Sequence, residues 1–457
     1  MIPILLALLA ASPTPTSPED VRPNVVLIVA DDAGWADFGF QGSTEASTPR
    51  LDALRASGTR FSRGYVTASV CSPSRAGLIT GRYQQRFGHE MNISGSGSHG
   101  MPPQERTLAN RLADVGYATE AIGKWHLGYQ PDMRPLQKGF DHFHGLLAGS
   151  RSYRPYSPDK KAPTRRMRID DRIIDDEESQ FDWITDYFGQ VGAETVTRLA
   201  PGKPFLVYLS FTAPHTPMEA SPEDLAASGE TDSRRRTYLA MQRAMDRAVG
   251  TVLDAIESSG EADRTIVWFV NDNGGATTNA SDNGTLRGMK GSKFEGGVRV
   301  PMLLRWPGIT TPGSTFSHPV STLDIAPTVL QAAGASLDAL DGVDLHPCLV
   351  GERTAPPHES LFWRRGPIAA TLEGDRWKLI RIQDDRVLLF DLDNDPSELV
   401  DVGDQHPEIR ARLLASIDAW ELELMEPGWQ SGQQWRDNQV KKHQPGVDTR
   451  EKERALP

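Results

Sequence analysis

Three short, uninterrupted apolar runs most constrain the fold of this chain. They are Asn24–Ala30, Pro204–Phe211 and Thr265–Val270. Such runs are typical of strands that are buried on both faces of a parallel sheet. Helical patterns over 104–115 and 235–258 alternate with them. The sequence therefore predicts an α/β domain with a large, mostly parallel sheet sandwiched by helices.

The pattern changes near residue 340. Short apolar segments separated by turn residues lead to an amphipathic helix over 407–424, which predicts a smaller C-terminal antiparallel sheet plus one helix. The predicted organisation is a signal segment at 1–18, a catalytic α/β domain at 22–339, an α+β subdomain at 340–428 and a polar, loosely held tail at 429–457.

Composition narrows the function. A formal charge of −12 argues against nucleic acid as a partner. The two cysteines, Cys71 and Cys348, cannot form a disulfide framework. The apolar run at 2–11 is too short to span a bilayer and stands where a signal peptide has its apolar region. We expect an exported protein, periplasmic or secreted, without stable membrane insertion.

Polar residues follow each predicted strand. Asp31 and Asp32 end the first, His215 follows the second, and Asp272 and Asn273 end the third. Because ligands bind at the carboxyl ends of parallel strands, these side chains are expected on one rim. Three carboxylates and an amide suit a hard cation, Ca²⁺ or Mg²⁺. Either pair alone is more typical of a helix cap or turn.

A cysteine precedes a predicted helix in the run Cys71-Ser-Pro-Ser-Arg75. The helix start favours anionic ligands, and Arg75 adds a fixed cation. Gly-rich segments supply Lys124, His126 and Lys290. Singly, such residues are usually solvated charges or structural histidines. Together they provide the cations and proton donors that a sulfate or phosphate ester site needs.

These blocks resemble the type I sulfatases of the alkaline-phosphatase superfamily, whose modification motif is C-x-P-S-R. The resemblance spans about residues 23 to 440. It rests on five blocks: Asp31-Asp32, Cys71 to Arg75, Gly123 to Gly128, Asp272-Asn273, and Lys290 to Arg299.

The resemblance implies a role for each matched residue. Cys71 becomes formylglycine, formed by a maturation enzyme, and its hydrate supplies the attacking oxygen. Calcium, with magnesium less favoured, is held by a set of five residues: Asp31, Asp32, Cys71, Asp272 and Asn273. Arg75 and Lys124 then position the modified residue. His215 and Lys290 contact the sulfate, and one of them protonates the leaving alcohol. His126 helps to expel sulfate.

The segment 151–172 has a local excess of positive charge and two tyrosines, Tyr153 and Tyr156. It is expected either to line the substrate cleft through Arg151 and Arg154, with Tyr153 and Tyr156 stacking on sugar rings and favouring a sulfated glycan, or to be a solvated surface loop. His89 and Glu90 are weaker candidates for the same cleft. Asp324 is expected to cap a helix, and Asp391, Asp393 and Asp395 to form an exposed turn.

The expected activity is hydrolysis of sulfate monoesters, of a carbohydrate and also of aryl sulfates. Two alternatives remain open. One is a phosphate or phosphonate monoester hydrolase, which would share the metal-assisted site. The other is a calcium-holding sulfate- or glycan-binding protein, which follows if Cys71 stays a thiol.

Overall fold

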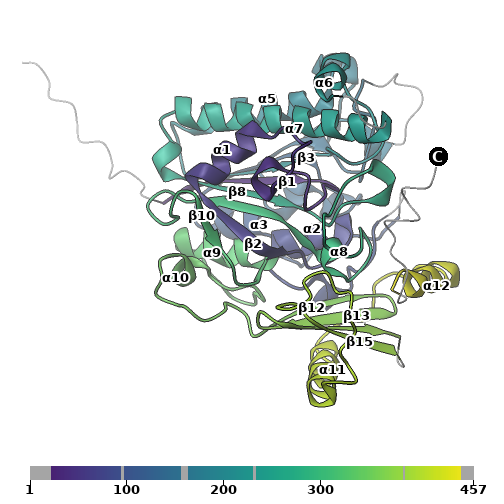
Figure 1. Ribbon diagram of the computed structural model, residues 1–457. Coiled ribbons are helices and arrows are strands. Elements are labelled where there is room, and N and C mark those ends of the chain that lie inside the picture. Colours follow the sequence, from purple (N-terminus) through teal and green to yellow (C-terminus); the bar gives the residue numbers. More distant parts are fainter. Residues whose placement is uncertain (1–21, 94–96, 156–162, 230–232, 384–385, 444–457) are drawn as a thin grey trace, which may run out of the picture.

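A large mixed sheet lies between two layers of helices, with a smaller sheet packed below it (Figure 1). The computed structural model describes residues 22–93, 97–155, 163–229, 233–383 and 386–443. The large sheet has the order β10-β2-β9-β8-β1-β7-β3-β4-β5-β6, with β11 paired to β2. Its strands are β1 Asn24–Ala30, β2 Thr59–Tyr65, β3 Ala118–Lys124, β4 His142–Leu146, β5 Arg168–Ile169, β6 Arg172–Ile173, β7 Phe205–Ser210, β8 Thr265–Asn271, β9 Arg299–Arg305, β10 Ser314–Phe316 and β11 Val320–Ser321.

The centre of the sheet is parallel. Strands β8, β1, β7, β3 and β4 pair in parallel, and Ile28 of β1 lies opposite Leu209 on one side and Phe269 on the other. Strand β9 runs antiparallel to β8 and β2, and β5 and β6 end the other edge in antiparallel pairs. The predicted α/β class is confirmed, and the three predicted strands are β1, β7 and β8.

Alternate side chains of the central strands feed two separate cores. Val26 and Ile28 pack with one helical layer, whereas Leu27 and Val29 pack with the other. The first layer consists of α1 Pro49–Ser57, α5 Ile184–Leu199 and α7 Ser233–Ser258. The second consists of α2 Cys71–Thr80, α3 Leu108–Asp114 and α9 Ile325–Ala332. Four short helices complete this domain: α4 Asp176–Ser179, α6 Pro222–Ala227, α8 Glu295–Val298 and α10 His346–Leu349.

Helix α3 begins later than its predicted start at 104. Thr107 adopts an extended backbone, and its side chain accepts a hydrogen bond from the Asn110 backbone N–H, while the Asn110 side-chain oxygen accepts one from the Thr107 backbone N–H. This reciprocal cap fixes the first turn of the helix after Thr107.

The C-terminal subdomain is an antiparallel sheet with one helix. Its strands are β12 Ser360–Arg365, β13 Ile368–Glu373, β14 Trp377–Ile382 and β15 Arg386–Asp391, and α11 is Pro407–Glu421. Leu413 and Ile417 of α11 pack on one sheet face against Leu379 and Leu389. The other face joins the catalytic domain, where the Trp363 indole N–H donates to the Val66 carbonyl at 2.6 Å.

The region after residue 428 was expected to be a loosely held tail, but its described part is packed. Residues 433–442 form α12, Gln433–Lys442, beside the C-terminal sheet (Figure 1). His443 is buried, its Nε2 accepts from the Lys293 backbone N–H at 2.9 Å, and its ring stacks on Phe294. These contacts join the end of α12 to the loop that follows β8.

The predicted signal segment at 1–18 lies outside the described residues. Across the described part of the chain, no helix combines the length and the apolar character that a membrane span requires.

Candidate active site

The carboxyl ends of four adjacent parallel strands, in the order β8-β1-β7-β3, meet at one edge of the large sheet. Each contributes polar residues at its end or in the loop that follows. The residues gathered at this edge are Asp31, Asp32, Lys124, His126, Ser210, His215, Asp272 and Asn273. The structure therefore brings the predicted rim residues together on a rigid scaffold.

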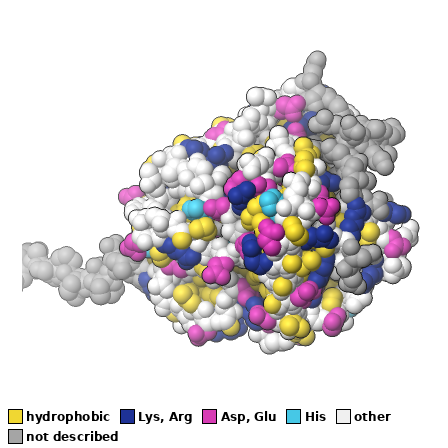
Figure 2. Space-filling view, turned by 60° about the horizontal axis from the view of Figure 1, so that its bottom comes forward, with side chains coloured by type: hydrophobic (Ala, Val, Ile, Leu, Met, Phe, Trp, Pro, Cys, Tyr) yellow, Lys and Arg dark blue, Asp and Glu magenta, His cyan; other side chains and the backbone are white. Residues whose placement is uncertain are grey.

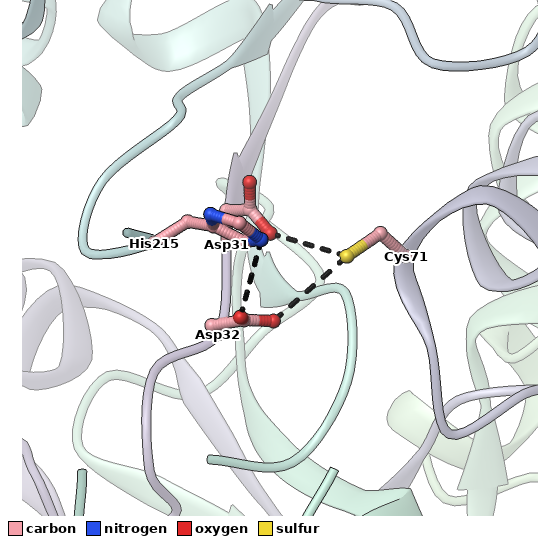
Figure 3. Close-up of side chains that lie close together, drawn as sticks. All are labelled: Asp31, Asp32, Cys71 and His215. Atoms are coloured by element: carbon pink, nitrogen blue, oxygen red, sulfur yellow. Dashed lines mark hydrogen bonds and ion pairs between the residues drawn. The ribbon is translucent and has the colours of Figure 1, made fainter. Parts of the chain in front are cut away.

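Cys71 is the first residue of α2, after the extended Val70. Its sulfur points at the rim and lies 3.5 Å from Asp31 Oδ1 and 3.8 Å from Asp32 Oδ1 (Figure 3). Lys290 donates to the same sulfur at 2.9 Å. Burial, reinforced by the carboxylates of Asp272 and Asp31, raises the pKa of the Cys71 thiol despite the neighbouring lysines. The Cys71 sulfur therefore lies between two carboxylates and an ammonium group.

Asp31 and Asp32 each contact a lysine. Lys124 donates to Asp31 Oδ2 at 2.6 Å, and neither side chain is exposed. Lys290 contacts Asp32 Oδ1, and the Asn273 amide donates to the same oxygen at 2.7 Å. Burial opposes ionisation of both carboxyls, but Lys124 for Asp31 and Lys290 for Asp32 hold each pKa below its usual value.

The residues present fit a divalent cation. Ligand atoms of Asp31, Asp32, Cys71 and His215 all lie within 4.8 Å of one another. Asn273 Oδ1 is buried and has no hydrogen-bond partner among the described residues. A buried carbonyl oxygen without a partner is costly unless a ligand completes it. Oxygen atoms from carboxylates and an amide are the ligands that Ca²⁺ and Mg²⁺ prefer.

Asp272 is shared between the rim and Arg75. Arg75 donates through Nε to Asp272 Oδ2 at 2.8 Å and also hydrogen-bonds Ser210 Oγ. The other Asp272 oxygen accepts from the Asp32 backbone N–H at 3.3 Å. Burial and the Asp31 charge raise the pKa of Asp272 to about 6. Arg75 is fully buried, so its role is to orient the Asp272 carboxylate from the interior of the protein.

His126 has a left-handed backbone conformation, with φ of 58°. A β-carbon at Gly149 would lie 2.5 Å from its ring, so only glycine leaves room there. Ser72 Oγ donates to the His126 carbonyl at 2.7 Å. Burial and the Lys124 charge lower the pKa of His126. The imidazole is thereby kept neutral at neutral pH, one residue after the Lys124-Trp125 segment.

His215 is fixed through its other ring nitrogen. Its Nδ1 bonds the Thr216 carbonyl at 2.6 Å, which leaves Nε2 facing Asp32 at 3.5 Å (Figure 3). Tyr153 donates to the carbonyls of Thr212 and His215 at 2.6 and 2.8 Å. Tyr153 is buried and engaged in this support, so it does not stack on a sugar as proposed from the sequence.

Arg151 and Arg154, which were predicted to contact the substrate, have partners within the protein. Arg151 is 1% exposed and forms a two-pronged ion pair with Asp176, so its guanidinium does not face a cleft. Arg154 is exposed and stacks over Trp183 at 4.9 Å. Tyr156 falls outside the described residues. A count of charges along the sequence could not show that Asp176 neutralises Arg151.

His89 and Glu90 are also buried. His89 Nε2 shares a hydrogen bond of 2.6 Å with Ser72 Oγ, and burial lowers its pKa to about 3. Glu90 bonds Arg364 of the C-terminal sheet. His89 therefore supports the start of α2, whereas Glu90 joins the loop after α2 to the C-terminal sheet and lines a hollow there.

Sequence reasoning missed the residues that hold the loops of the site. Ser210 hydrogen-bonds Arg75, and Asn279 donates to the carbonyls of Asp32 and Pro214 at 3.0 Å each. Asn279 thus links the loop that follows β1 to the loop that carries His215. Neither residue stands in a recognisable motif, because each acts through contacts with residues far away in the sequence.

Asp324 and the 391–395 turn do not enter the site. Asp324 occupies the N-cap of α9 but makes no side-chain cap hydrogen bond there, so the predicted cap is not formed. Its Oδ2 instead accepts from the Ser321 backbone N–H at 2.7 Å, in a capping box of the short 322–324 turn before α9. Asp391 pairs with Arg376 at the surface.

A parallel sheet with oxygen ligands at its carboxyl edge, and a helix-start cysteine flanked by lysines, defines a hydrolase of alkaline-phosphatase-like fold. The chain belongs to the sulfatase family. The family model described as Sulfatase matches residues 23–335, and that described as N-sulphoglucosamine sulphohydrolase, C-terminal, matches residues 290–421. Sulfuric ester hydrolysis is therefore the activity class of this chain.

Relatives agree over most of the chain. It is 36% identical to human (Homo sapiens) arylsulfatase A over 371 residues, which cover 75% of this chain and 70% of that protein. It is 33% identical to human N-acetylgalactosamine-6-sulfatase over 375 residues, covering 77% and 70%. The structure of Ps i-CgsB in complex with k-i-k-neocarrahexaose superposes with a TM-score of 0.85 at 33% identity, covering 94% of this chain and 99% of that one.

Proposed function

We propose that this enzyme hydrolyses sulfate monoesters of carbohydrates to the alcohol and inorganic sulfate, with a nucleophile derived from Cys71. The observation that carries this proposal is the placement of the Cys71 sulfur between Asp31, Asp32 and Lys290, at the start of α2. Conversion to formylglycine would supply, as its hydrate, an attacking oxygen at this position. Aryl sulfates would be accepted as simple substrates.

Calcium is the proposed metal, with magnesium less favoured. Asp31, Asp32, Asp272 and Asn273 would hold it together with the modified Cys71, and the partnerless Asn273 oxygen supports this assignment. His215 Nε2 belongs to the same cluster, so it would lie beside the ion or the sulfate. A bound calcium would polarise the sulfate and neutralise its charge.

The chain's own side chains complete the site. Lys290 spans Cys71 and Asp32, so its ammonium would neutralise the negative charge of a sulfate bound there. Lys124 and Arg75 hold Asp31 and Asp272 in place. His215, oriented by the Thr216 carbonyl, presents Nε2 to hold a proton for the leaving oxygen. His126, kept neutral, would accept a proton when sulfate is released.

A carbohydrate substrate is supported by the relatives. Ps i-CgsB was crystallised with k-i-k-neocarrahexaose, and another similar protein carries the name N-acetylgalactosamine-6-sulfatase. Export to the periplasm or the outside, and maturation by a formylglycine-generating enzyme, complete the proposal. The export signal at 1–18 and the maturation partner rest on the sequence alone.

Mass spectrometry of the peptide that contains Cys71, on protein from a host with a maturation enzyme, tests the nucleophile. We expect the mass loss of thiol-to-aldehyde conversion, together with a higher kcat/KM for 4-nitrophenyl sulfate than for 4-nitrophenyl phosphate. The Cys71→Ala variant should be inactive. A preference for phosphate would favour the phosphate or phosphonate hydrolase. An unmodified thiol without turnover would favour the binding protein.

A further inference from the structure

Two buried cations lie next to the active site without a carboxylate partner. Lys293 is 1% exposed, and its ammonium has one hydrogen-bond partner in the described ranges, Ser69 Oγ at 3.2 Å. Arg365 is 8% exposed, and within the described part of the chain its guanidinium makes no hydrogen bond or ion pair. A buried charge without an opposite charge is costly. Such a pair is therefore typical of a place where an anion binds.

Both cations are close to Cys71 through short connections. Ser69, which Lys293 contacts, precedes Cys71 by two residues, and its carbonyl accepts from the Gly291 backbone N–H at 2.7 Å. Gly291 directly follows Lys290, which contacts the Cys71 sulfur at 2.9 Å. A β-carbon on Gly291 would lie 3.7 Å from Arg365 Nη1. Arg365 and Lys293 thus lie around the same loop that supplies Lys290.

The nearest acidic group is already engaged. Glu90 is the carboxylate that acts on both cations, and it pairs with Arg364. In line with this shortage of negative charge, burial and the Arg365 charge lower the pKa of Lys293 to about 7, and burial lowers the pKa of Arg365 to about 10. The local balance is positive beside the site that takes the sulfate.

An aromatic wall and a hollow adjoin these cations. Arg365 stacks over Trp435 of α12 at 4.6 Å. A hollow of about 170 Å³ lies beside Trp435, between the loop that follows α2, the β12–β13 turn and α12. Its lining includes the basic Arg364 and Arg436, the acidic Glu90 and Glu426, and Gly366 and Trp435; Arg365 and Lys293 are not part of that lining, but Arg365 stands between Arg364 and Gly366 in the chain. On the face in Figure 2, lysine and arginine side chains gather near the centre around a histidine and acidic groups. Near Cys71, Trp435 supplies a stacking group and Arg365 and Lys293 supply positive charge, which are the features that a sulfated sugar would meet.

We propose that Arg365 and Lys293 form an anion subsite that binds a second acidic group of the substrate, beside the sulfate that is hydrolysed. The inference rests on the proposed sulfatase function and names its substrate class: glycans that carry another sulfate or a carboxylate near the scissile ester. Arg365 is the more exposed of the two and binds the oxyanion through its guanidinium. Lys293, which is more deeply buried, adds a second positive charge that attracts the same oxyanion.

The test compares substrates within each variant. The holoenzyme with converted Cys71 is assayed on three sulfated disaccharides, which carry one sulfate, two sulfates, or one sulfate and one carboxylate. We expect the doubly charged substrates to be preferred, and Arg365→Gln to lower that preference in kcat/KM by about 10- to 100-fold. Lys293→Met should lower it less. The larger drop, for the second sulfate or for the carboxylate, identifies the acid that binds.

The matched control is Arg410→Gln, which removes an arginine from exposed α11 and should leave the preference ratio as in the wild type. If Arg365→Gln also leaves the ratio unchanged, or if Arg365→Lys fails to retain part of it, the subsite does not exist. Calorimetric binding of the disulfated disaccharide to Cys71→Ala, with and without Arg365→Gln, separates the two hypotheses. A lost affinity without wild-type turnover would refute the sulfatase function and keep the subsite. Normal turnover with unchanged affinity would refute the subsite alone.

Discussion

Two buried clusters of carboxylates and lysines differ in how completely their charges are satisfied. The rim cluster holds Asp31, Asp32, Lys124 and Lys290, and the interface cluster holds Tyr65, Glu295, Lys378 and Glu398. In the interface cluster, Lys378 lies 2.7 Å from Glu295 and 2.9 Å from Glu398, with no exposure on any of the three side chains. Tyr65 donates to Glu295 at 2.8 Å. Each of these charges contacts an opposite charge.

The rim cluster is less closed. Lys290 is 17% exposed, and the neighbouring Asn273 oxygen has no partner within the described residues. Burial and charge are shared by both clusters, and Glu398 Oε1 of the interface cluster also has no hydrogen-bond partner within the described residues. That oxygen still lies 2.9 Å from the Lys378 ammonium, so access and the Asn273 oxygen without a counter-charge distinguish the rim. The interface cluster joins the C-terminal sheet to the loop that carries Lys290, so it stabilises the arrangement, whereas the rim is the part proposed to perform the chemistry. The predictions below are ordered by the size of their expected effect.

Asp31→Asn should have the largest effect. It removes the charge of a carboxylate that is proposed to bind the metal. It also removes the ion pair that Asp31 makes with the buried Lys124 at 2.6 Å. We expect kcat/KM for 4-nitrophenyl sulfate to fall on the order of 10³-fold, since a bound cation contributes several kcal/mol to such a reaction. Chelation should abolish wild-type activity, and calcium should restore it and raise Tm.

The control for Asp31→Asn is Asp393→Asn, which changes an exposed carboxylate of the 391–395 turn. Its activity should equal that of the wild type. Retention of more than a tenth of the activity in Asp31→Asn, or full activity after chelation, would contradict the assignment of the rim as a metal site.

Lys378→Met should act on stability. It leaves Glu295 and Glu398 buried without a counter-charge, and we expect the free energy of unfolding to drop by about 3–5 kcal/mol. Denaturant unfolding measures this loss. Lys441→Met, at an exposed position of α12, should change it by less than about 0.5 kcal/mol. A Lys378→Met variant as stable as this control would show that the interface cluster is not closed by its charges.

The pH dependence of stability offers a finer test of the interface cluster. Burial and the Glu295 charge raise the pKa of Glu398 from its ordinary 4.5 to about 7, although Lys378 opposes the shift. The folded state therefore keeps a proton that the unfolded state has lost between these two values, so this carboxyl lowers stability as pH rises from 4.5 to 7. We expect Glu398→Gln to abolish that loss, about 2 kcal/mol, in unfolding curves at pH 5 and 7.5. Parallel pH profiles for wild type and variant would contradict it.

The central site was accessible from sequence because it depends on local signals. Asp31 and Asp272 follow apolar strands, and strand ends meet whenever neighbouring strands are parallel. Lys124 was found through its Gly-rich segment. The cysteine motif fixed Cys71 independently. In contrast, Arg365 and α12 lie near the loop that carries Lys290 only because the C-terminal subdomain packs there. No local sequence pattern predicts that packing. The basic segment 151–172 misled for the same reason, since Asp176 neutralises Arg151 only in the folded chain.

Arg154→Ala should have the smallest effect, and it separates charge from burial. Arg154 is exposed and stacks on Trp183, which is worth about 0.5–1 kcal/mol at a solvated position. We expect unfolding to lose no more than that, and kcat/KM on a disulfated disaccharide to fall less than about threefold. Arg151→Met, which removes the buried ion pair with Asp176, should instead lose about 3 kcal/mol of stability. A tenfold loss of glycan turnover in Arg154→Ala, at unchanged stability, would show that Arg154 contacts the substrate. An exposed charge would then contribute to substrate binding as well as the buried ones.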